Sequence, residues 1–168
     1  MRCIADSAAG PPYAPAPDTR PSVTLREFRP TDLPFVGAIV AEALHEHYDP
    51  SLYTSLSMEW PSGFLVAADA SDVPAGFLLG VNQVEGEARI LMFAVERSQR
   101  SRGIGTLLMS AFLDRARARG FRRITLEVRV SNATAIRFYT RYQFGVVDLL
   151  RTYYSDGENG YQMAHDLR

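Results

Sequence analysis

The chain has 168 residues, of which 46% are hydrophobic and 22% charged, a composition that suits one globular domain with a substantial core. Its formal net charge of −1 gives no overall positive field for nucleic acid, and no apolar run approaches the roughly 20 residues that span a bilayer. All 18 basic residues are arginine, and the single cysteine, Cys3, excludes an internal disulfide and indicates a reducing, cytoplasmic setting.

Residues 1–21 are expected to form a disordered tail outside the folded domain. Five prolines stand there, most of them among alanine and glycine, and such a composition cannot bury enough apolar surface to pack. The domain itself is therefore expected over residues 22–168.

Strand and helix patterns follow one another through the rest of the chain. The first half predicts a strand over 22–29, a helix capped by Thr31 or Asp32, a short second helix ending near Trp60 and Pro61, and strands over 64–68, 75–84 and 88–95. The second half predicts a helix over 104–119 that ends at Gly120, a strand over 121–130 and a short helix over 132–141. Two last strands are predicted over 144–154 and 161–167, around a turn at Asp156 and Gly157. The run 88–95 is almost wholly apolar, which indicates a central strand. This order predicts a mixed α and β domain around a central sheet.

The turn between the strand 88–95 and the helix 104–119 reads Arg100-Ser101-Arg102-Gly103-Ile104-Gly105-Thr106. The first N–H groups of a helix lack intrahelical partners and carry partial positive charge, and glycines let a phosphate approach them closely. The chain has no lysine for a Walker GxxxxGK[ST] loop, and it lacks the last glycine of GxGxxG. A two-glycine turn also serves as an ordinary tight connection, so this run alone leaves both explanations open.

Residues 126–144 form a second constellation, with Glu127 on a strand, Tyr139 on the following helix and Asn132 at their junction. Ser131 or Asn132 can cap that helix. For Asn132, the capping role and a ligand contact are equally open.

Together the two segments resemble the GNAT superfamily of acetyl-CoA-dependent N-acetyltransferases. The phosphate loop of that family, Q/RxxGxG/A, is matched by Arg100, Gly103 and Gly105. Its second block is matched by Asn132, Ala135, Ile136, Phe138, Tyr139 and Phe144. Gln143 departs from the pattern, because the family usually has glycine there.

Within the superfamily, the closer likeness is to protein N-terminal acetyltransferases, both the bacterial RimI type and the archaeal and eukaryotic catalytic subunits. Three features are similar to that group: the sequence pattern LEVR.SN..AI.FY, the pair Trp60-Pro61 and the closing segment 153–163. The resemblance covers about residues 23–167. It implies a mixed α/β (α+β) GNAT fold, with a central, mostly antiparallel, twisted sheet of six to seven strands, splayed between the fourth and fifth strands and flanked by about four helices.

The resemblance also implies acetyl-CoA as co-substrate and no metal. The residues expected to bind it are Phe93, Ala94, Val95, Arg100, Ser101, Arg102, Gly103, Ile104, Gly105, Thr106, Asn132 and Tyr139. Backbone groups of residues 93–95 would pair with the pantetheine arm, and an amide near Val95 would stabilise the developing oxyanion.

By the same resemblance, Glu127 would act as general base, through a water, and Tyr139 as the acid that protonates the sulfur of CoA. Each residue also has a structural explanation. Glu127 could be an exposed strand carboxylate paired with Arg122 or Arg129, and Tyr139 could be an aromatic residue of the helix core.

For the acceptor, Tyr153 and Tyr154 are candidates to hold a peptide N-terminus, although alternation along a half-exposed strand would also explain them. The segment 45–53, which includes Tyr48, would form the opposite wall by analogy with the family. His45 and His47 are too sparse for a metal site and are expected at the surface.

The predicted function is acetyl transfer from acetyl-CoA to the N-terminal α-amine of a protein, with ribosomal proteins among the acceptors considered. The alternatives are a GNAT enzyme for a small amine and a non-catalytic acyl-CoA-binding module. The expected partner is the N-terminal segment of an acceptor protein, with no nucleic acid or membrane, and the oligomeric state stays open.

Overall fold

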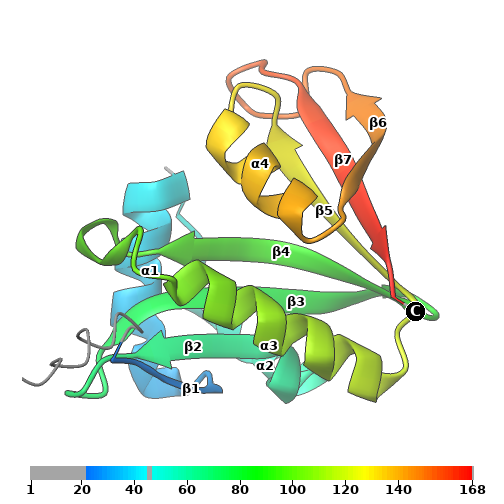
Figure 1. Cartoon of the computed structure of the whole chain (residues 1–168). Helices are drawn as coiled ribbons and strands as arrows, with labels where there is room; N and C mark the ends of the chain where they lie inside the picture. Colours follow the sequence, from blue (N-terminus) through cyan, green and yellow to red (C-terminus); the bar gives the residue numbers. More distant parts are fainter. Residues whose placement is uncertain (1–21, 45–46, 168) are drawn as a thin grey trace, which may run out of the picture.

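A computed structural model describes residues 22–44 and 47–167 (Figure 1). Within these ranges the elements are β1 (Thr24–Glu27), α1 (Leu33–Leu44), α2 (Pro50–Glu59), β2 (Phe64–Ala68), β3 (Pro74–Val84), β4 (Glu87–Val95), α3 (Ile104–Arg119), β5 (Arg123–Arg129), α4 (Ala133–Arg141), β6 (Gly145–Leu150) and β7 (Gly160–Asp166), with short 3-10 turns at Pro30–Asp32, Pro61–Gly63 and Arg97–Gln99. The predicted tail, residues 1–21, and His45 lie outside the described residues.

The seven strands form one sheet in the order β1-β2-β3-β4-β5-β7-β6. Every neighbouring pair is antiparallel except β4 with β5, which is parallel. The apolar run 88–95 lies in β4, the middle strand, so the prediction of a central strand is confirmed. The mixed, mostly antiparallel GNAT fold predicted from the sequence is likewise confirmed.

β4 and β5 pair only along their first halves and then diverge (Figure 1). Their last paired residues are Ile90 and Leu126. At the same place the register of β3 with β4 shifts, because Leu79 is opposite Met92 while Gly80 is opposite Ile90. Leu91 is therefore the extra residue of a β-bulge, which reverses the face to which the following side chains point.

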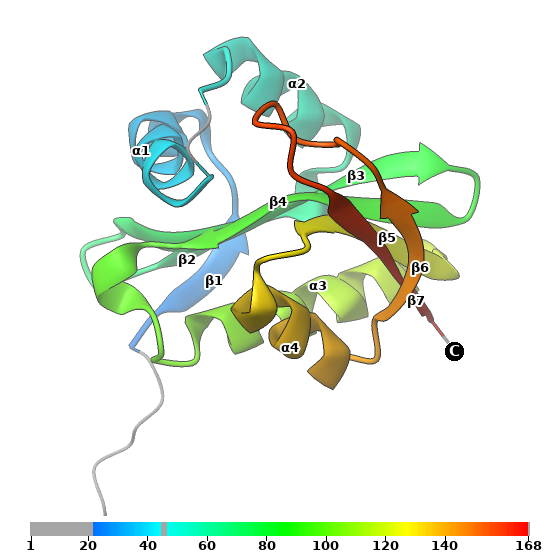
Figure 2. The ribbon, with the colours of Figure 1, turned by 90° about the horizontal axis from the view of Figure 1, so that it is seen from above.

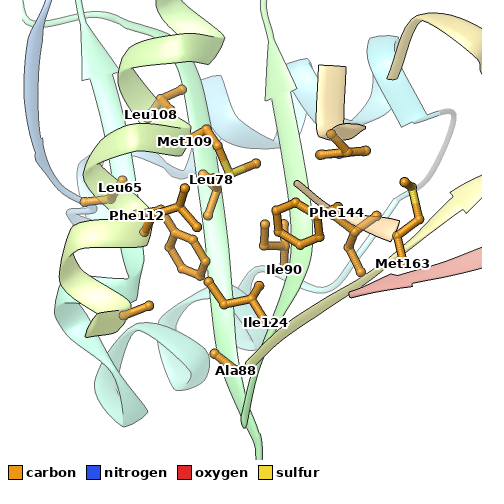
Figure 3. Packing of buried hydrophobic residues seen from close by; sticks show 14 of the residues in the cluster. Leu65, Leu78, Ala88, Ile90, Leu108, Met109, Phe112, Ile124, Phe144 and Met163 are labelled. Atoms are coloured by element: carbon orange, nitrogen blue, oxygen red, sulfur yellow. The ribbon is translucent and has the colours of Figure 1, made fainter. Parts of the chain in front are cut away.

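Helices cover both faces of the sheet, with α1 and α2 on one side and α3 and α4 on the other (Figure 2). Each side has its own apolar core. The α3-side core includes Ile104, Leu108, Met109, Phe112 and Ala116 of α3, packed on Leu65, Leu78, Ala88, Ile90, Ile124, Leu126 and Val128 (Figure 3). The α1-side core includes Val36, Ile39, Val40, Tyr53, Phe64, Val66, Phe77, Leu79, Met92 and Ala94.

Two details of the predicted elements are wrong. The strand expected over 144–154 ends at Leu150, so Tyr153 and Tyr154 lie in the β6–β7 connection and not on a strand. A 3-10 turn precedes α1, and the Asp32 carboxylate accepts hydrogen bonds from the Arg29 backbone N–H and the Arg26 guanidinium. Asp32 thus stabilises the turn before the helix instead of capping α1.

The C-terminus of α4 has a Schellman motif built on Gln143. The Phe144 N–H donates to the Tyr139 carbonyl and the Gln143 N–H to the Thr140 carbonyl, at 3.2 and 2.9 Å. The rings of Phe144 and Tyr139 pack at 5.9 Å, which supplies the apolar contact of that motif. Gln143 has φ of +65°, a left-handed conformation that glycine adopts more easily than any residue with a Cβ atom.

Replacing Gln143 with glycine is expected to raise the free energy of unfolding by about 1 kcal/mol, since the left-handed strain disappears while the backbone hydrogen bonds remain. Urea titration would measure the gain. The matched control is Gln143→Ala, which keeps the Cβ atom and should change stability little. Equal stability of the glycine and alanine variants would show that the left-handed conformation at residue 143 is not strained.

Candidate functional site

A cavity of about 700 Å³ opens where β4 has left β5. Its lining comes from the end of β4, the loop before α3, the first turn of α3, α4 with its N-cap, and Ala43 of α1. Of the twelve residues predicted to bind the co-substrate, eleven line it: Phe93, Ala94, Val95, Arg100, Ser101, Gly103, Ile104, Gly105, Thr106, Asn132 and Tyr139. Arg102 is exposed and does not line the cavity.

The loop before α3 has the geometry of an anion site. Ser101 and Gly103 both have left-handed φ, at +62° and +84°, and turns of this kind direct successive N–H groups to one side. Gly103 is the N-cap of α3, and within the described ranges no side chain caps this end of the helix. The N–H groups of the first turn therefore remain available to an anion such as phosphate.

The backbone of β4 next to the cavity offers further donors and acceptors. The Glu96 N–H donates to the Ala75 carbonyl at 2.9 Å and so points toward β3. Because successive residues of a strand direct their polar groups to opposite sides, those of Phe93 and Val95 point toward the gap and those of Ala94 toward β3. Of the backbone groups predicted to be free over 93–95, those of Phe93 and the N–H of Val95 face the gap, whereas the Val95 carbonyl accepts from the Arg100 side chain.

Arg100 is tied to this strand end by its own side chain, because its Nε donates to the Val95 carbonyl at 2.9 Å. The guanidinium therefore already has one partner at the edge of the cavity, where the sequence predicted a contact with phosphate.

Tyr139 faces the cavity from α4 and is buried. Its ring packs against those of Phe93, Phe138 and Phe144, with centroids 5.7 to 6.4 Å apart. Burial raises the pKa of Tyr139 well above its ordinary value, so the hydroxyl keeps its proton at neutral pH. The residue is both a core aromatic and a protonated hydroxyl that lines the cavity.

Asn132 is the N-cap of α4, because its Oδ1 accepts from the Ala135 N–H at 3.1 Å. The capping role is therefore present in the structure, and the same residue also lines the cavity. Ser131 does not cap the helix; its N–H donates to the Glu158 carboxylate at 3.0 Å.

Glu127 lies on the other face of the sheet. Its neighbours Leu126 and Val128 belong to the α3-side core, so alternation along β5 directs Glu127 away from it. Its carboxylate is paired with Arg89 of β4, whose Nε and Nη2 both lie 2.7 Å from Oε2. The pairing with Arg122 or Arg129 that the sequence left open is not the one that forms.

Tyr153 and Tyr154 lie in the β6–β7 connection, which bends to the side of the sheet covered by α1 and α2 (Figure 2). The Tyr153 hydroxyl accepts from Nη2 of Arg89 at 3.0 Å, and the two tyrosine rings meet edge to face at 5.1 Å. The Arg129 guanidinium stacks over the Tyr154 ring at 4.0 Å. Burial raises the pKa of Tyr154 to about 12, and the positive charge of Arg129 opposes this rise.

The same connection is fixed by ion pairs. Arg129 Nη1 lies 2.8 Å from the carboxylates of both Asp156 and Glu158. Hydrogen bonds from Ser131 and Arg129 lower the pKa of Glu158 to about 2. The loop that carries the two tyrosines is therefore held to the end of β5.

The remaining predicted acceptor residue, Tyr48, is exposed in the connection before α2, and so is His47. Among the described residues no group of three or more His, Cys, Asp or Glu could hold a metal ion. Within the same ranges, no helix has the length and apolar content needed to cross a membrane.

Sequence reasoning missed two parts of the site. Arg89 had no signal of its own, because its partners are 38 and 64 residues away along the chain. Phe138 and Arg141 also line the cavity, and their spacing from Thr134 and Ala135 on one helix could have shown that they share a face.

Residues 25–144 match the sequence pattern of the Acetyltransferase (GNAT) family. The chain belongs to the GNAT family. An N-alpha-acetyltransferase of Sulfurisphaera tokodaii is 31% identical over 155 residues, covering 85% of this chain and 92% of that protein. An uncharacterised N-acetyltransferase of Methanocaldococcus jannaschii is 36% identical over 140 residues, covering 83% and 88%. The crystal structure of Ard1 from Thermoplasma volcanium has a TM-score of 0.83 and 40% identity, covering 88% of this GNAT chain and 99% of the other.

The ion pairs of the β6–β7 connection predict that this GNAT domain loses stability in acid. The folded-state pKa of Glu158 is about 2, below its ordinary 4.5, so between these values the unfolded chain binds more protons. The stabilisation from Glu158 is complete above pH 4.5 and is lost as the pH falls toward 2.

Urea unfolding at steps through this pH range would measure the effect. The free energy of unfolding should fall less steeply with acid for Glu158→Gln than for the unaltered chain. Glu59→Gln, at an exposed carboxylate of α2, should keep the original slope. An unchanged slope in Glu158→Gln would show that Glu158 contributes no pH dependence.

Proposed function

We propose that the chain transfers acetyl from acetyl-CoA to the N-terminal α-amine of a protein. The observation that carries this proposal is the parting of β4 and β5 at Ile90 and Leu126, with the Tyr139 cavity on one face and the Glu127 carboxylate on the other. Such an arrangement lets the two substrates approach from opposite faces and meet in one ternary complex. The named activity of the relative from Sulfurisphaera tokodaii supports the same acceptor class.

The cavity suits acetyl-CoA in both shape and chemistry. The uncapped first turn of α3 and the left-handed turn at Ser101 and Gly103 would bind the pyrophosphate. The outward backbone groups of Phe93 would pair with the amides of the pantetheine arm, whereas at Val95 only the N–H is open, because the carbonyl accepts from Arg100. Asn132 would contact the same arm while it caps α4, and Arg102 would act only through its charge at the rim.

The proposed chemistry needs one proton acceptor and one proton donor. An α-amine with a pKa near 8 is largely protonated at neutral pH, so Glu127 would accept its proton, through a water, before the nitrogen attacks the thioester carbon. The Val95 N–H would stabilise the oxyanion. As the carbon–sulfur bond breaks, Tyr139 would give its proton to the CoA thiolate, and the second proton that the nitrogen loses on becoming an amide would restore the Tyr139 hydroxyl.

The acceptor would lie on the face of α1 and α2, between Tyr48 and the tyrosine pair of the β6–β7 connection. Tyr153 and Tyr154 would hold the peptide backbone near its first residue. We place the reaction in the cytoplasm, in keeping with a chain of a single cysteine. Ribosomal proteins, as in the RimI type, are among the acceptors to test.

Incubation with acetyl-CoA and a panel of N-terminal peptides is expected to release CoA and to acetylate the α-amine, which mass spectrometry of the products would locate. Free polyamines and aminoglycosides in the same assay test the small-amine alternative. CoA release with amines but with no peptide would show that the acceptor is a small amine and not a protein N-terminus. Acetyl-CoA binding without any transfer would favour a non-catalytic module.

Glu127→Gln and Tyr139→Phe are each expected to lower kcat by about 10²- to 10⁴-fold, the usual contribution of a general base or acid. The dissociation constant for CoA should stay the same, because neither change removes a contact with the phosphates. Calorimetric titration and steady-state kinetics would measure the two quantities.

The matched controls are Glu87→Gln, at a β4 carboxylate near Arg123, and Tyr161→Phe, at a half-buried tyrosine of β7. Both should keep the original kcat. If the Glu127 and Tyr139 variants also keep it, the assigned roles are wrong.

A further inference from the structure

Arg89 lies where β4 is about to leave β5. It is opposite Thr125, one position before the last pair of Ile90 with Leu126. Its neighbours Ala88 and Ile90 belong to the α3-side core, so its side chain points to the opposite face, the one that carries Glu127. A long cationic side chain thus stands at the fork of the sheet, on the proposed acceptor side.

The contacts of Arg89 use only one oxygen of Glu127. Nε and Nη2 both lie 2.7 Å from Oε2. Among the described residues, no hydrogen bond reaches Oε1. The guanidinium therefore fixes the carboxylate and leaves its second oxygen for a water or an amine.

Among the described residues, Arg89 is the one cation that forms an ion pair with Glu127. Arg129, two residues further along β5, is held by Asp156 and Glu158 at 2.8 Å each and lies over the Tyr154 ring. The side chains of Arg89 and Glu127 are only 25% and 11% exposed, so water screens their attraction less than it would at the surface.

The same guanidinium also contacts Tyr153, one of the two tyrosines proposed to hold the acceptor peptide. Nη2 of Arg89 donates to the Tyr153 hydroxyl at 3.0 Å while it contacts Glu127. Tyr153 belongs to the β6–β7 connection and packs edge to face on Tyr154. Arg89 of β4 is thus bonded both to β5, through Glu127, and to the β6–β7 connection, through Tyr153.

We propose that Arg89 is a positioning residue that orients the carboxylate of Glu127 and sets its distance from Tyr153. Arg89 itself exchanges no proton with the substrates. It holds Oε2 so that Oε1 faces the approaching α-amine, and it sets the spacing between the base and the tyrosine that would hold the peptide. This inference rests on the proposed function of Glu127 as general base.

The test uses the full chain with acetyl-CoA and the best peptide of the panel. Arg89→Met keeps the length of the side chain and removes both contacts. It is expected to lower kcat by about 10- to 100-fold, the loss that follows when a reacting group is misplaced by about 1 Å. The KM for acetyl-CoA should stay within about twofold, since Arg89 is outside the cavity lining.

Two further variants separate positioning from folding. Arg89→Lys keeps a cation near Glu127 but cannot bridge to Tyr153, so its kcat should lie between those of the unaltered chain and Arg89→Met. Arg123→Met is the matched control, because Arg123, at the start of β5, pairs with Glu87 and Asp166 and not with Glu127, so that its loss should leave kcat unchanged.

The decisive measurement is the double variant Arg89→Met with Glu127→Gln. If Arg89 acts through Glu127, the double variant is no slower than Glu127→Gln alone, whereas independent effects would multiply. Multiplied losses, or a full kcat in Arg89→Met, would overturn the positioning role.

Thermal unfolding of every variant identifies any loss of rate that follows from a loss of fold. If the unaltered chain acetylates no peptide, the proposed function fails instead. The two failures are therefore distinguishable.

Discussion

The loss of pairing between β4 and β5 beyond Ile90 and Leu126 is the constraint on which the site depends. Neighbouring strands of a sheet normally pair the backbone N–H and C=O groups of one another. Where the pairing is interrupted, these groups need other partners. Here one such partner comes from the chain itself, as the Arg100 side chain bonds to the Val95 carbonyl. The cavity, the exposed strand edge and the access from both faces all follow from this single interruption.

The bulge at Leu91 and the parting of the strands act together. Before the bulge, Ala88 and Ile90 pack in the α3-side core; after it, Met92 and Ala94 pack in the α1-side core. Phe93 is consequently turned toward α4, where it meets the rings of Phe138 and Tyr139. A regular strand would have directed Phe93 to the other face and left Tyr139 without this neighbour.

Much of the fold was predictable, because the elements follow from local patterns. The apolar run of β4 and the glycine that ends α3 each carry their own signal. What could not be predicted depends on contacts across the sheet. The bulge at Leu91 has no marker in the sequence, the pairing of Arg89 with Glu127 joins distant strands, and the aromatic run at Tyr153 and Tyr154 looks like a strand until the ties to Arg129 bend it into a loop.

The contacts between Arg129 and the β6–β7 connection affect how much conformational entropy is lost when a substrate binds. Loops that recognise peptides commonly lose conformational freedom on binding, and that loss weakens affinity. In this chain, Asp156 and Glu158 are already bonded to Arg129, and Tyr154 is already stacked beneath its guanidinium. The proposed acceptor wall is therefore ordered before a peptide would bind, so the ordering cost of recognition would fall on the N-terminus of the acceptor.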